Sequence, residues 1–329
     1  MPTATPAIDQ LVNSLGGTDV QAAITLLKAN FVKSDALTDE ELNRALLQGL
    51  LVRYARGLQV LSNPATAPAE PAAPFYSEIF EGHIGYLRFG ALNSANLTSL
   101  DKKLEEFAAK KTDAMVVDLR DNDSASDFAA AAEFAKRFCP KGKLLFTLRK
   151  PAARQDRAFS SDREPAVRAL IVVLIDTDTS GAAEAVATAL HTYNKALLIG
   201  QPTAGRAVEY ADLPLPSGKI LRVATAETVG PDGQLLFPDG VKPDLPVEMA
   251  RSDKRQIFAL SAEKGMAPFV YETERPHLNE AALITGTNPE LESGETQRRN
   301  RGREKLPVRD PVLQRALDVI ASLEIFQKR

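Results

Sequence analysis

The chain has 329 residues, of which 44% are hydrophobic, and its formal net charge is −3. This composition supplies a sizeable core and excludes a disordered chain. The charge, spread over basic residues that mostly alternate with acidic ones, gives no electrostatic basis for binding nucleic acid. No stretch approaches about 18 continuous apolar residues, so the sequence predicts no membrane span.

Cysteine and histidine are scarce. The single cysteine, Cys139, cannot form an internal disulfide, and we expect it to be a packed structural thiol. The three histidines, His83, His191 and His277, form no cluster with zinc-ligand spacing. The sequence therefore predicts neither a metal site nor a cofactor.

The N-terminal region is expected to be a helical module over residues 1–62, with helix from residue 8 onward. Apolar residues recur there near helical spacing, and Thr38 with Glu41 forms a capping box. We interpret it as a packing or dimerisation appendage, which leaves a homo-oligomer open. The first residues, M-P-T-A-T-P-A, lack a signal-peptide pattern, so the protein is either cytoplasmic or a trimmed mature form.

A linker is expected over residues 63–77, because Asn63–Pro74 has four prolines and no large apolar residue. A core domain over 78–250 follows, in which buried strands alternate with helices, an order that predicts parallel strands. The predicted strands are 83–89, 115–119, 144–148, 170–175 and 196–199, and the predicted helices are 100–107, 128–138 and 182–193. Residues 150–164 are expected to be a surface loop, and 213–224 a hairpin.

The last part, residues 251–329, is expected to be a polar loop followed by a docking helix. The loop is centred on 285–303, where a cluster of arginines lies beside Glu295 and Glu304. The helix is predicted to start at Asp310 and Pro311, with Leu313, Leu317 and Ile320 on one apolar face.

Four motifs stand in the core in this order: G-H-I-G-Y-L at 82–87, D-L-R-D-N at 118–122, G-Q-P-T-A-G at 200–205 and G-V-K-P-D at 240–244. With the strand, turn and helix of 170–194, they resemble the tail-specific, or C-terminal processing, serine peptidase family. The resemblance covers roughly residues 80–248 and implies an α/β core of the Clp-protease/crotonase-like kind. It also implies a peptide or protein substrate and a periplasmic or extracytoplasmic location. A PDZ domain, which many family members carry, has no room here.

The resemblance further implies where a serine-lysine dyad would lie. The family has its serine in S-A-x-E and its lysine in T-x-G-K; here the glutamate is Glu184, the serine position is Gly181 and the lysine position is Arg206. Glycine has no nucleophile, and a guanidinium stays protonated at physiological pH. Ser124 and Ala125 replace two glycines of the family's oxyanion loop, where side chains restrict the backbone.

Ser180 is a fallback nucleophile if the turn is shifted by one residue. The competing interpretation, which we favour, makes Ser180 the N-cap of the following helix. His191 lies roughly three turns along that helix and Lys195 at its far end, so neither is an evident base.

Two pairs of charged residues near the site are expected to have structural roles. Asp176 and Asp178 are expected to hold a turn, because two carboxylates without a third ligand are a weak cation site. Asp118 and Arg120 are expected to form an ion pair or backbone bond that fixes the loop after their strand.

The leading prediction is therefore a pseudoprotease that binds a peptide or protein segment, such as a C-terminus, in the former active-site cleft. Arg206, Thr203 and Gly205 are the peptide-binding candidates, with Arg206 able to hold a carboxylate by two hydrogen bonds. One alternative is an active serine-type peptidase that uses Ser180. The other is a structural or oligomerising protein with a filled cleft.

Overall fold

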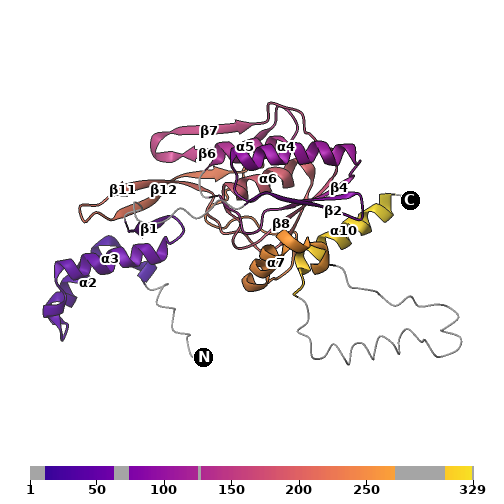
Figure 1. Ribbon diagram of the computed structural model, residues 1–329. Helices are drawn as coiled ribbons and strands as arrows, with labels where there is room; N and C mark the ends of the chain where they lie inside the picture. Colours follow the sequence, from indigo (N-terminus) through magenta and orange to yellow (C-terminus); the bar gives the residue numbers. More distant parts are fainter. Residues whose placement is uncertain (1–11, 63–73, 125–126, 271–307, 328–329) are drawn as a thin grey trace, which may run out of the picture.

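The computed structural model describes residues 12–62, 74–124, 127–270 and 308–327 (Figure 1). Its centre is a six-stranded sheet in the order β13-β10-β8-β4-β3-β2, parallel except for β2, which is antiparallel to β3. The strands are β2 (Tyr76–Phe80), β3 (Ile84–Arg88), β4 (Ala114–Asp118), β8 (Leu170–Ile175), β10 (Leu197–Gly200) and β13 (Leu245–Pro246). The predicted parallel core is confirmed, although it starts at Tyr76, inside the predicted linker.

The central strands are apolar because both faces of the sheet are covered. Successive side chains point to opposite faces, so Val116 and Val117 of β4 belong to two different core clusters. Val172 and Val173 of β8 divide in the same way. Alternate residues of the short run L-I-V-V-L-I at 170–175 thus contribute to the core clusters on the two faces of the sheet.

Helices cover both faces of this sheet, and the two groups of helices belong to the two core clusters (Figure 1). The first group is α4 (Ser94–Ala109), α5 (Phe128–Lys136) and α6 (Ala182–Asn194); the second is α7 (Arg251–Lys264) and α10 (Pro311–Gln327). Short 3-10 turns lie at Ser34–Ala36, Pro151–Ala153 and Ala267–Phe269. Residues 182–190 of α6 are all buried, which explains its alanine-rich sequence. The predicted docking helix is present, with Leu313, Leu317 and Ile320 buried, whereas α7 was not predicted.

A second, antiparallel sheet corrects two predictions. It consists of β1 (Leu58–Leu61), β6 (Leu144–Lys150), β7 (Gln155–Ser160), β11 (Val208–Pro214) and β12 (Ile220–Val229). The hairpin of β11 and β12 is confirmed. Helix through residue 62 is wrong, since Leu58–Leu61 pairs with β12, and the surface loop at 150–164 is wrong, since β7 pairs with β6. In both places backbone pairing outweighs local sequence preference.

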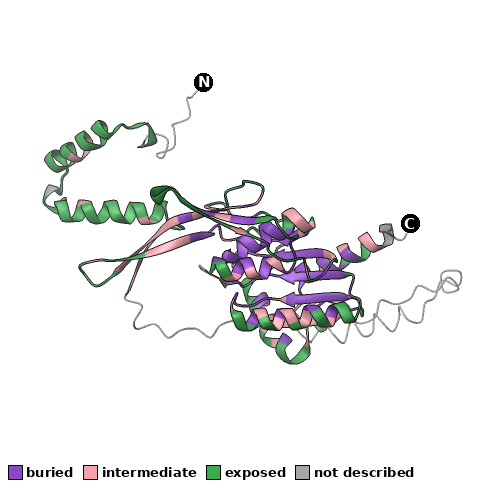
Figure 2. Ribbon diagram, turned by 90° about the horizontal axis from the view of Figure 1, so that it is seen from above, coloured by how far each residue is buried: buried purple, intermediate pink, exposed green. Residues whose placement is uncertain are grey.

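The helices of the N-terminal module extend away from the core. Neither α2 (Gly17–Asn30) nor α3 (Asp39–Arg53) has a buried residue, as the exposed colouring in Figure 2 shows. The Thr38 hydroxyl caps α3 by accepting from Glu41 N–H at 3.2 Å, which is one half of the predicted capping box, while the Glu41 carboxylate pairs with Arg44. The two helices therefore bury no residue against the core, whereas Leu58–Leu61 attaches the end of the module to β12. The dimerisation role stays a prediction. In the described ranges, no helix combines the length and apolarity of a membrane span.

A buried ion network ties the sheet to the C-terminal helix. The Arg120 guanidinium binds Asp118 through Nε and Nη2, and Asp310 through Nη1 at 2.9 Å and Nη2 at 2.8 Å. Burial alone would raise the pKa of Asp118, but Arg120 and the Tyr86 hydroxyl outweigh burial and lower it. Asp310 also accepts from the N–H groups of Val312 and Leu313, so it caps α10 as well. The predicted Asp118–Arg120 pair is confirmed, with Asp310 as an unforeseen third member.

We expect Asp310→Asn to lower the free energy of unfolding by about 3 kcal/mol, because the buried guanidinium would lose one of its two charged partners. Urea denaturation followed by circular dichroism measures this change. Asp318→Asn, which alters an exposed carboxylate of the same helix, is the control and should change stability by less than about 0.5 kcal/mol. Equal stability of the two variants would contradict a structural role for this network.

Candidate functional site

The candidate site lies where the loops after β4 and β8 meet. Two short strands, β5 (Asp123–Ser124) and β9 (Ser180–Gly181), pair in parallel and place Ser124 opposite Gly181. The positions predicted for the oxyanion loop and for the nucleophile, 57 residues apart in the sequence, are thus neighbours. Ala125, the other predicted oxyanion-loop residue, lies outside the described residues.

The turn before Gly181 is built by Asp176 and Thr179. Asp176 Oδ1 accepts from the N–H groups of Asp178 at 3.0 Å and Thr179 at 2.9 Å. The Thr179 hydroxyl donates to the Leu119 carbonyl at 2.9 Å, which joins the turn to the loop after β4. The predicted turn role of Asp176 is confirmed.

The cation that faces these carboxylates is a lysine side chain. Lys254 of α7 is buried, and its Nζ lies 2.5 Å from Asp176 Oδ2, 2.8 Å from Asp178 Oδ2 and 3.4 Å from Asp121 Oδ1. Burial alone would lower the pKa of Lys254, but the three carboxylates raise it above its ordinary value. The amine is therefore held protonated and cannot serve as a base at neutral pH.

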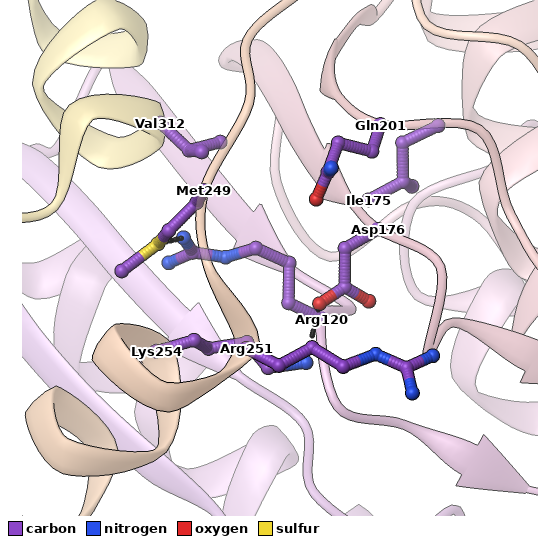
Figure 3. A pocket seen from close by; sticks show the side chains of 8 residues that line it. All are labelled: Arg120, Ile175, Asp176, Gln201, Met249, Arg251, Lys254 and Val312. Carbon is purple, nitrogen blue, oxygen red and sulfur yellow. Dashed lines mark hydrogen bonds and ion pairs between the residues drawn. The ribbon is translucent and has the colours of Figure 1, made fainter.

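A small cavity lies beside Lys254 and Asp176 (Figure 3). Its wall combines the turn after β8 with Met249, which precedes α7, with Arg251 of α7 and with Val312 of α10. The volume of about 10 Å³ suits a single water molecule. A peptide segment does not fit into it.

Glu184 is the centre of the site. Its carboxylate is fully buried and accepts four hydrogen bonds, two on each oxygen. Oε1 accepts from the Thr203 hydroxyl at 2.5 Å and from Gly205 N–H at 2.8 Å, and Oε2 accepts from Gly181 N–H at 3.0 Å and Arg206 N–H at 2.8 Å. Burial raises the pKa of Glu184, and these four donors act against that rise.

Glu184 Oε2 brings together Gly181 and Arg206, the predicted serine and lysine positions. Because the N–H groups of Gly181 and Arg206 bind the same Glu184 oxygen, their backbones are neighbours in space. The Arg206 side chain itself is exposed. Thr203 and Gly205, the other peptide-binding candidates, are buried and direct their hydroxyl and N–H to Glu184.

Gly181, not Ser180, is the N-cap of α6, so the predicted cap is wrong. Gly181 has φ 63° and ψ −126°, a conformation that residues with a side chain rarely adopt. Ser180 lies in β9, is 4% exposed, and donates its N–H to the Asn122 carbonyl. Glu184 satisfies the Gly181 N–H, which leaves Ser180 no capping role.

His191 and Lys195, the two residues weighed as bases, lie toward the far end of α6. His191 Nε2 lies 3.4 Å from Asp244 Oδ1, near the end of α6. Lys195 ends the helix with φ 49°. The sequence analysis assigned neither residue as a base, and neither belongs to the group around Glu184.

Sequence reasoning missed Lys254, Asp310 and Thr179. The position of Lys254 in a polar helix gives no local signal, because its partners come from the turn after β8, more than 70 residues away. Asp310 was detected as a helix start but not as a partner of Arg120. Such contacts arise only when the chain is folded.

The fold and the site define an α/β protein with a mostly parallel sheet and a strand-turn-helix site at the carboxyl ends of its strands. The model of peptidase family S41 matches residues 83–247, just over half of the chain. The chain belongs to peptidase family S41.

The most similar curated proteins include C-terminal processing proteases. The chain is 24% identical over 260 residues to the carboxy-terminal processing protease CtpA of Bacillus subtilis, covering 78% of this chain and 52% of that protein. It is 30% identical over 163 residues to the chloroplastic carboxyl-terminal-processing peptidase 1 of Arabidopsis thaliana, covering 49% of this chain and 33% of the other. The chain thus spans about a third to a half of these relatives' length.

A solved structure supports the fold. A crystal structure titled as that of a putative peptidase from Parabacteroides merdae aligns with a TM-score of 0.53 and 18% identity, covering 74% of this chain and 85% of the other. At this identity the match concerns the fold alone. It agrees with the predicted peptidase-type α/β class.

We expect Glu184→Gln to lower the free energy of unfolding by about 2–3 kcal/mol, because the amide NH₂ would face N–H or O–H donors in a buried place. Thermal and urea unfolding measure the change. The control is Glu106→Gln on α4, whose carboxylate lies at the surface between Lys103 and Lys110 and should matter little. An equally small effect at Glu184 would contradict its central place in the site.

Proposed function

We propose that this chain is a catalytically inactive member of peptidase family S41 that binds a peptide or protein segment at the former active site. The observation that carries the proposal is the convergence of Gly181 and Arg206 on one oxygen of Glu184. This shared contact supports the assignment of these residues to the family's serine and lysine positions. The scaffold that would align a dyad is then intact, while both reacting side chains are absent.

The surrounding side chains offer no evident replacement for the dyad. Ser180 carries a hydroxyl, but a serine needs a neutral base within hydrogen-bond reach. Lys254 is protonated among three carboxylates, and His191 faces Asp244. In the described part of the chain, no base contacts the Ser180 hydroxyl, which favours the inactive form over a peptidase that uses Ser180.

Peptide binding does not need the missing side chains. Extended segments bind mainly through backbone hydrogen bonds and side-chain pockets. Arg206 is exposed beside the Glu184 centre and has five N–H donors that match a carboxylate. Thr203 and Gly205, through Glu184, would position Arg206 rather than contact the peptide. A segment that ends in a free carboxylate is therefore the ligand we favour.

Catalytic inactivity is tested by incubating the purified protein with a mixed peptide library and reading the products by mass spectrometry. We expect no cleavage that depends on the site. Ser180→Ala is run in parallel, and a family member with an intact dyad is the positive control. Cleavage by the wild type that is lost in Ser180→Ala would overturn the proposal in favour of the Ser180 peptidase.

Ligand binding is tested by fluorescence anisotropy with labelled peptides from the same library that end in either a free carboxylate or an amide. We expect the protein to prefer the free carboxylate. Arg206→Ala should weaken this binding by about tenfold or more, the loss typical of a charge-assisted hydrogen bond, and should leave the amidated peptides unchanged.

Arg168→Ala is the matched control. Arg168 is also exposed, but it lies before the amino end of β8, whereas the candidate site follows the carboxyl end of that strand. If both arginine variants bind the carboxylate as the wild type does, Arg206 is not its receptor. If the folded protein binds no peptide of either kind, the structural alternative with a filled cleft replaces the binding proposal.

A further inference from the structure

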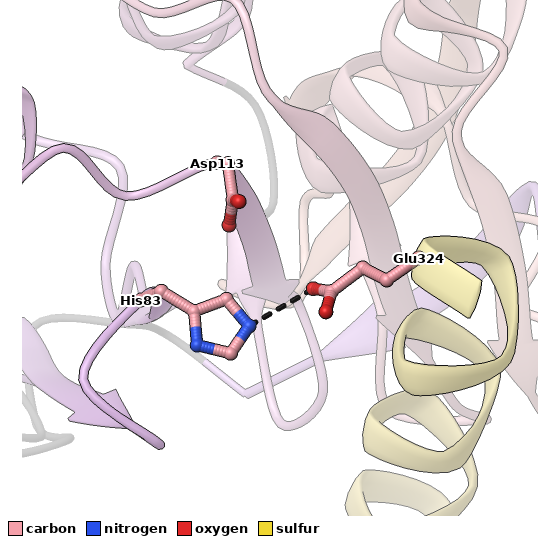
Figure 4. A group of neighbouring side chains, drawn as sticks. All are labelled: His83, Asp113 and Glu324. Atoms are coloured by element: carbon pink, nitrogen blue, oxygen red, sulfur yellow. Dashed lines mark hydrogen bonds and ion pairs between the residues drawn. The ribbon is translucent and has the colours of Figure 1, made fainter. Parts of the chain in front are cut away.

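A second group of chemically active side chains lies away from the Glu184 centre. It consists of His83, Asp113 and Glu324, which point toward one another in Figure 4. One ligand atom from each residue lies within 4.8 Å of the other two. His83 and Asp113 directly precede β3 and β4 and so lie at the amino ends of these strands. The Glu184 site lies beyond the carboxyl ends of the parallel strands, so the two groups are at opposite ends of the strands.

The backbone fixes the first two members. His83 closes a tight turn between β2 and β3, in which Glu81 and Gly82 have φ of 51° and 79° and His83 N–H donates to the Phe80 carbonyl. Asp113 N–H donates to the His83 carbonyl at 3.3 Å, and the Asp113 carbonyl accepts from Leu170. Neighbouring parallel strands thus present an imidazole and a carboxylate at the same level of the sheet.

The imidazole is oriented like that of a metal ligand. His83 Nδ1 lies 3.0 Å from the Glu81 carbonyl oxygen, which can only accept, so Nδ1 carries the hydrogen of this bond. Nε2 then faces the carboxylates, 2.9 Å from Glu324 Oε1. Because Nδ1 carries a hydrogen, the contact of Nε2 with a carboxylate oxygen requires a proton on Nε2 in the metal-free protein, and a metal ion would displace that proton. The hydrogen bond from Nδ1–H to a backbone carbonyl is the usual arrangement of a metal-binding histidine.

We propose that His83, Asp113 and Glu324 form a binding site for a divalent transition-metal ion of the zinc type. One neutral imidazole and two carboxylates balance the charge of a divalent cation. The imidazole favours such an ion over magnesium or calcium, which prefer oxygen ligands. A tetrahedral zinc ion holds its ligand atoms at about 2.0–2.2 Å from the metal. To bind it, the His83–Glu324 pair, now at 2.9 Å, has to open, and the wider separations in the group, up to 4.8 Å, have to close. A fourth position stays open to water.

Metal binding here would have a structural consequence. Glu324 lies near the end of α10, and the buried Asp310 network fixes the start of the same helix. The contact of Glu324 with His83 already attaches the far end of α10 to the sheet, and a metal ion would strengthen this attachment by adding Asp113. The site does not depend on the proposed peptide binding.

The test is isothermal titration of zinc into full-length protein that has been freed of metal with a chelator, with thermal unfolding measured in parallel. We expect one zinc ion per chain and a higher unfolding temperature with zinc. His83→Ala and Glu324→Gln should each weaken binding at least about tenfold, because loss of a direct ligand should cost no less than loss of an outer-shell partner.

His191→Ala is the matched control, since His191 also faces a carboxylate, Asp244, but has no third ligand in the described region. It should bind zinc as the wild type does. The proposal is overturned if the wild type binds no zinc, if Glu324→Gln and His83→Ala both bind it with unchanged affinity, or if His191→Ala is the variant that loses it. Circular dichroism without zinc checks that each variant is folded, and Glu324→Gln decides the result if His83→Ala is not.

Discussion

The arrangement of the central sheet and the C-terminal helix depends on the buried ion pairs that the Arg120 guanidinium forms with Asp118 and Asp310. Arg120 follows β4 directly, and its two carboxylate partners come from the end of that strand and from the start of α10. Removing three charges from water is costly unless each is paired and hydrogen-bonded, and here the Tyr86 hydroxyl and the α10 backbone complete the set. The network thereby positions both the loop of the candidate site and the C-terminal helix.

The same dependence on buried charge organises the Glu184 site. Without this carboxylate, the N–H groups of Gly181, Gly205 and Arg206 would have to find other partners inside the protein. With it, the helix start and the loop after β10 are held together, and Thr203 continues the chain of contacts by accepting from Val241 N–H at 2.8 Å. Two of the motifs noticed in the sequence, at 200–205 and 240–244, therefore meet because they are parts of one hydrogen-bonded structure.

The sequence predicted what depends on short-range pattern and missed what depends on distant contacts. The apolar run at 170–175 and the alanine-rich helix after it were predicted because burial leaves a clear composition. The strand at 155–160 was mistaken for a loop because its charged residues are acceptable in an antiparallel edge strand. The group of His83, Asp113 and Glu324 spans 241 residues from first to last, so no spacing rule could detect it.

Under the proposed function, the difference between buried hydrogen-bonding groups and reacting side chains explains how a peptidase fold can persist without a catalytic dyad. The contacts of Glu184 with positions 181 and 206 use backbone N–H groups, which every residue except proline provides. Exchanging the side chains at these positions therefore leaves the buried hydrogen bonds in place. At position 181, glycine also adopts φ 63° without the strain that a serine would bear. Loss of catalysis under the proposed function would thus cost no stability, and selection for a folded binding protein would have no reason to restore the serine.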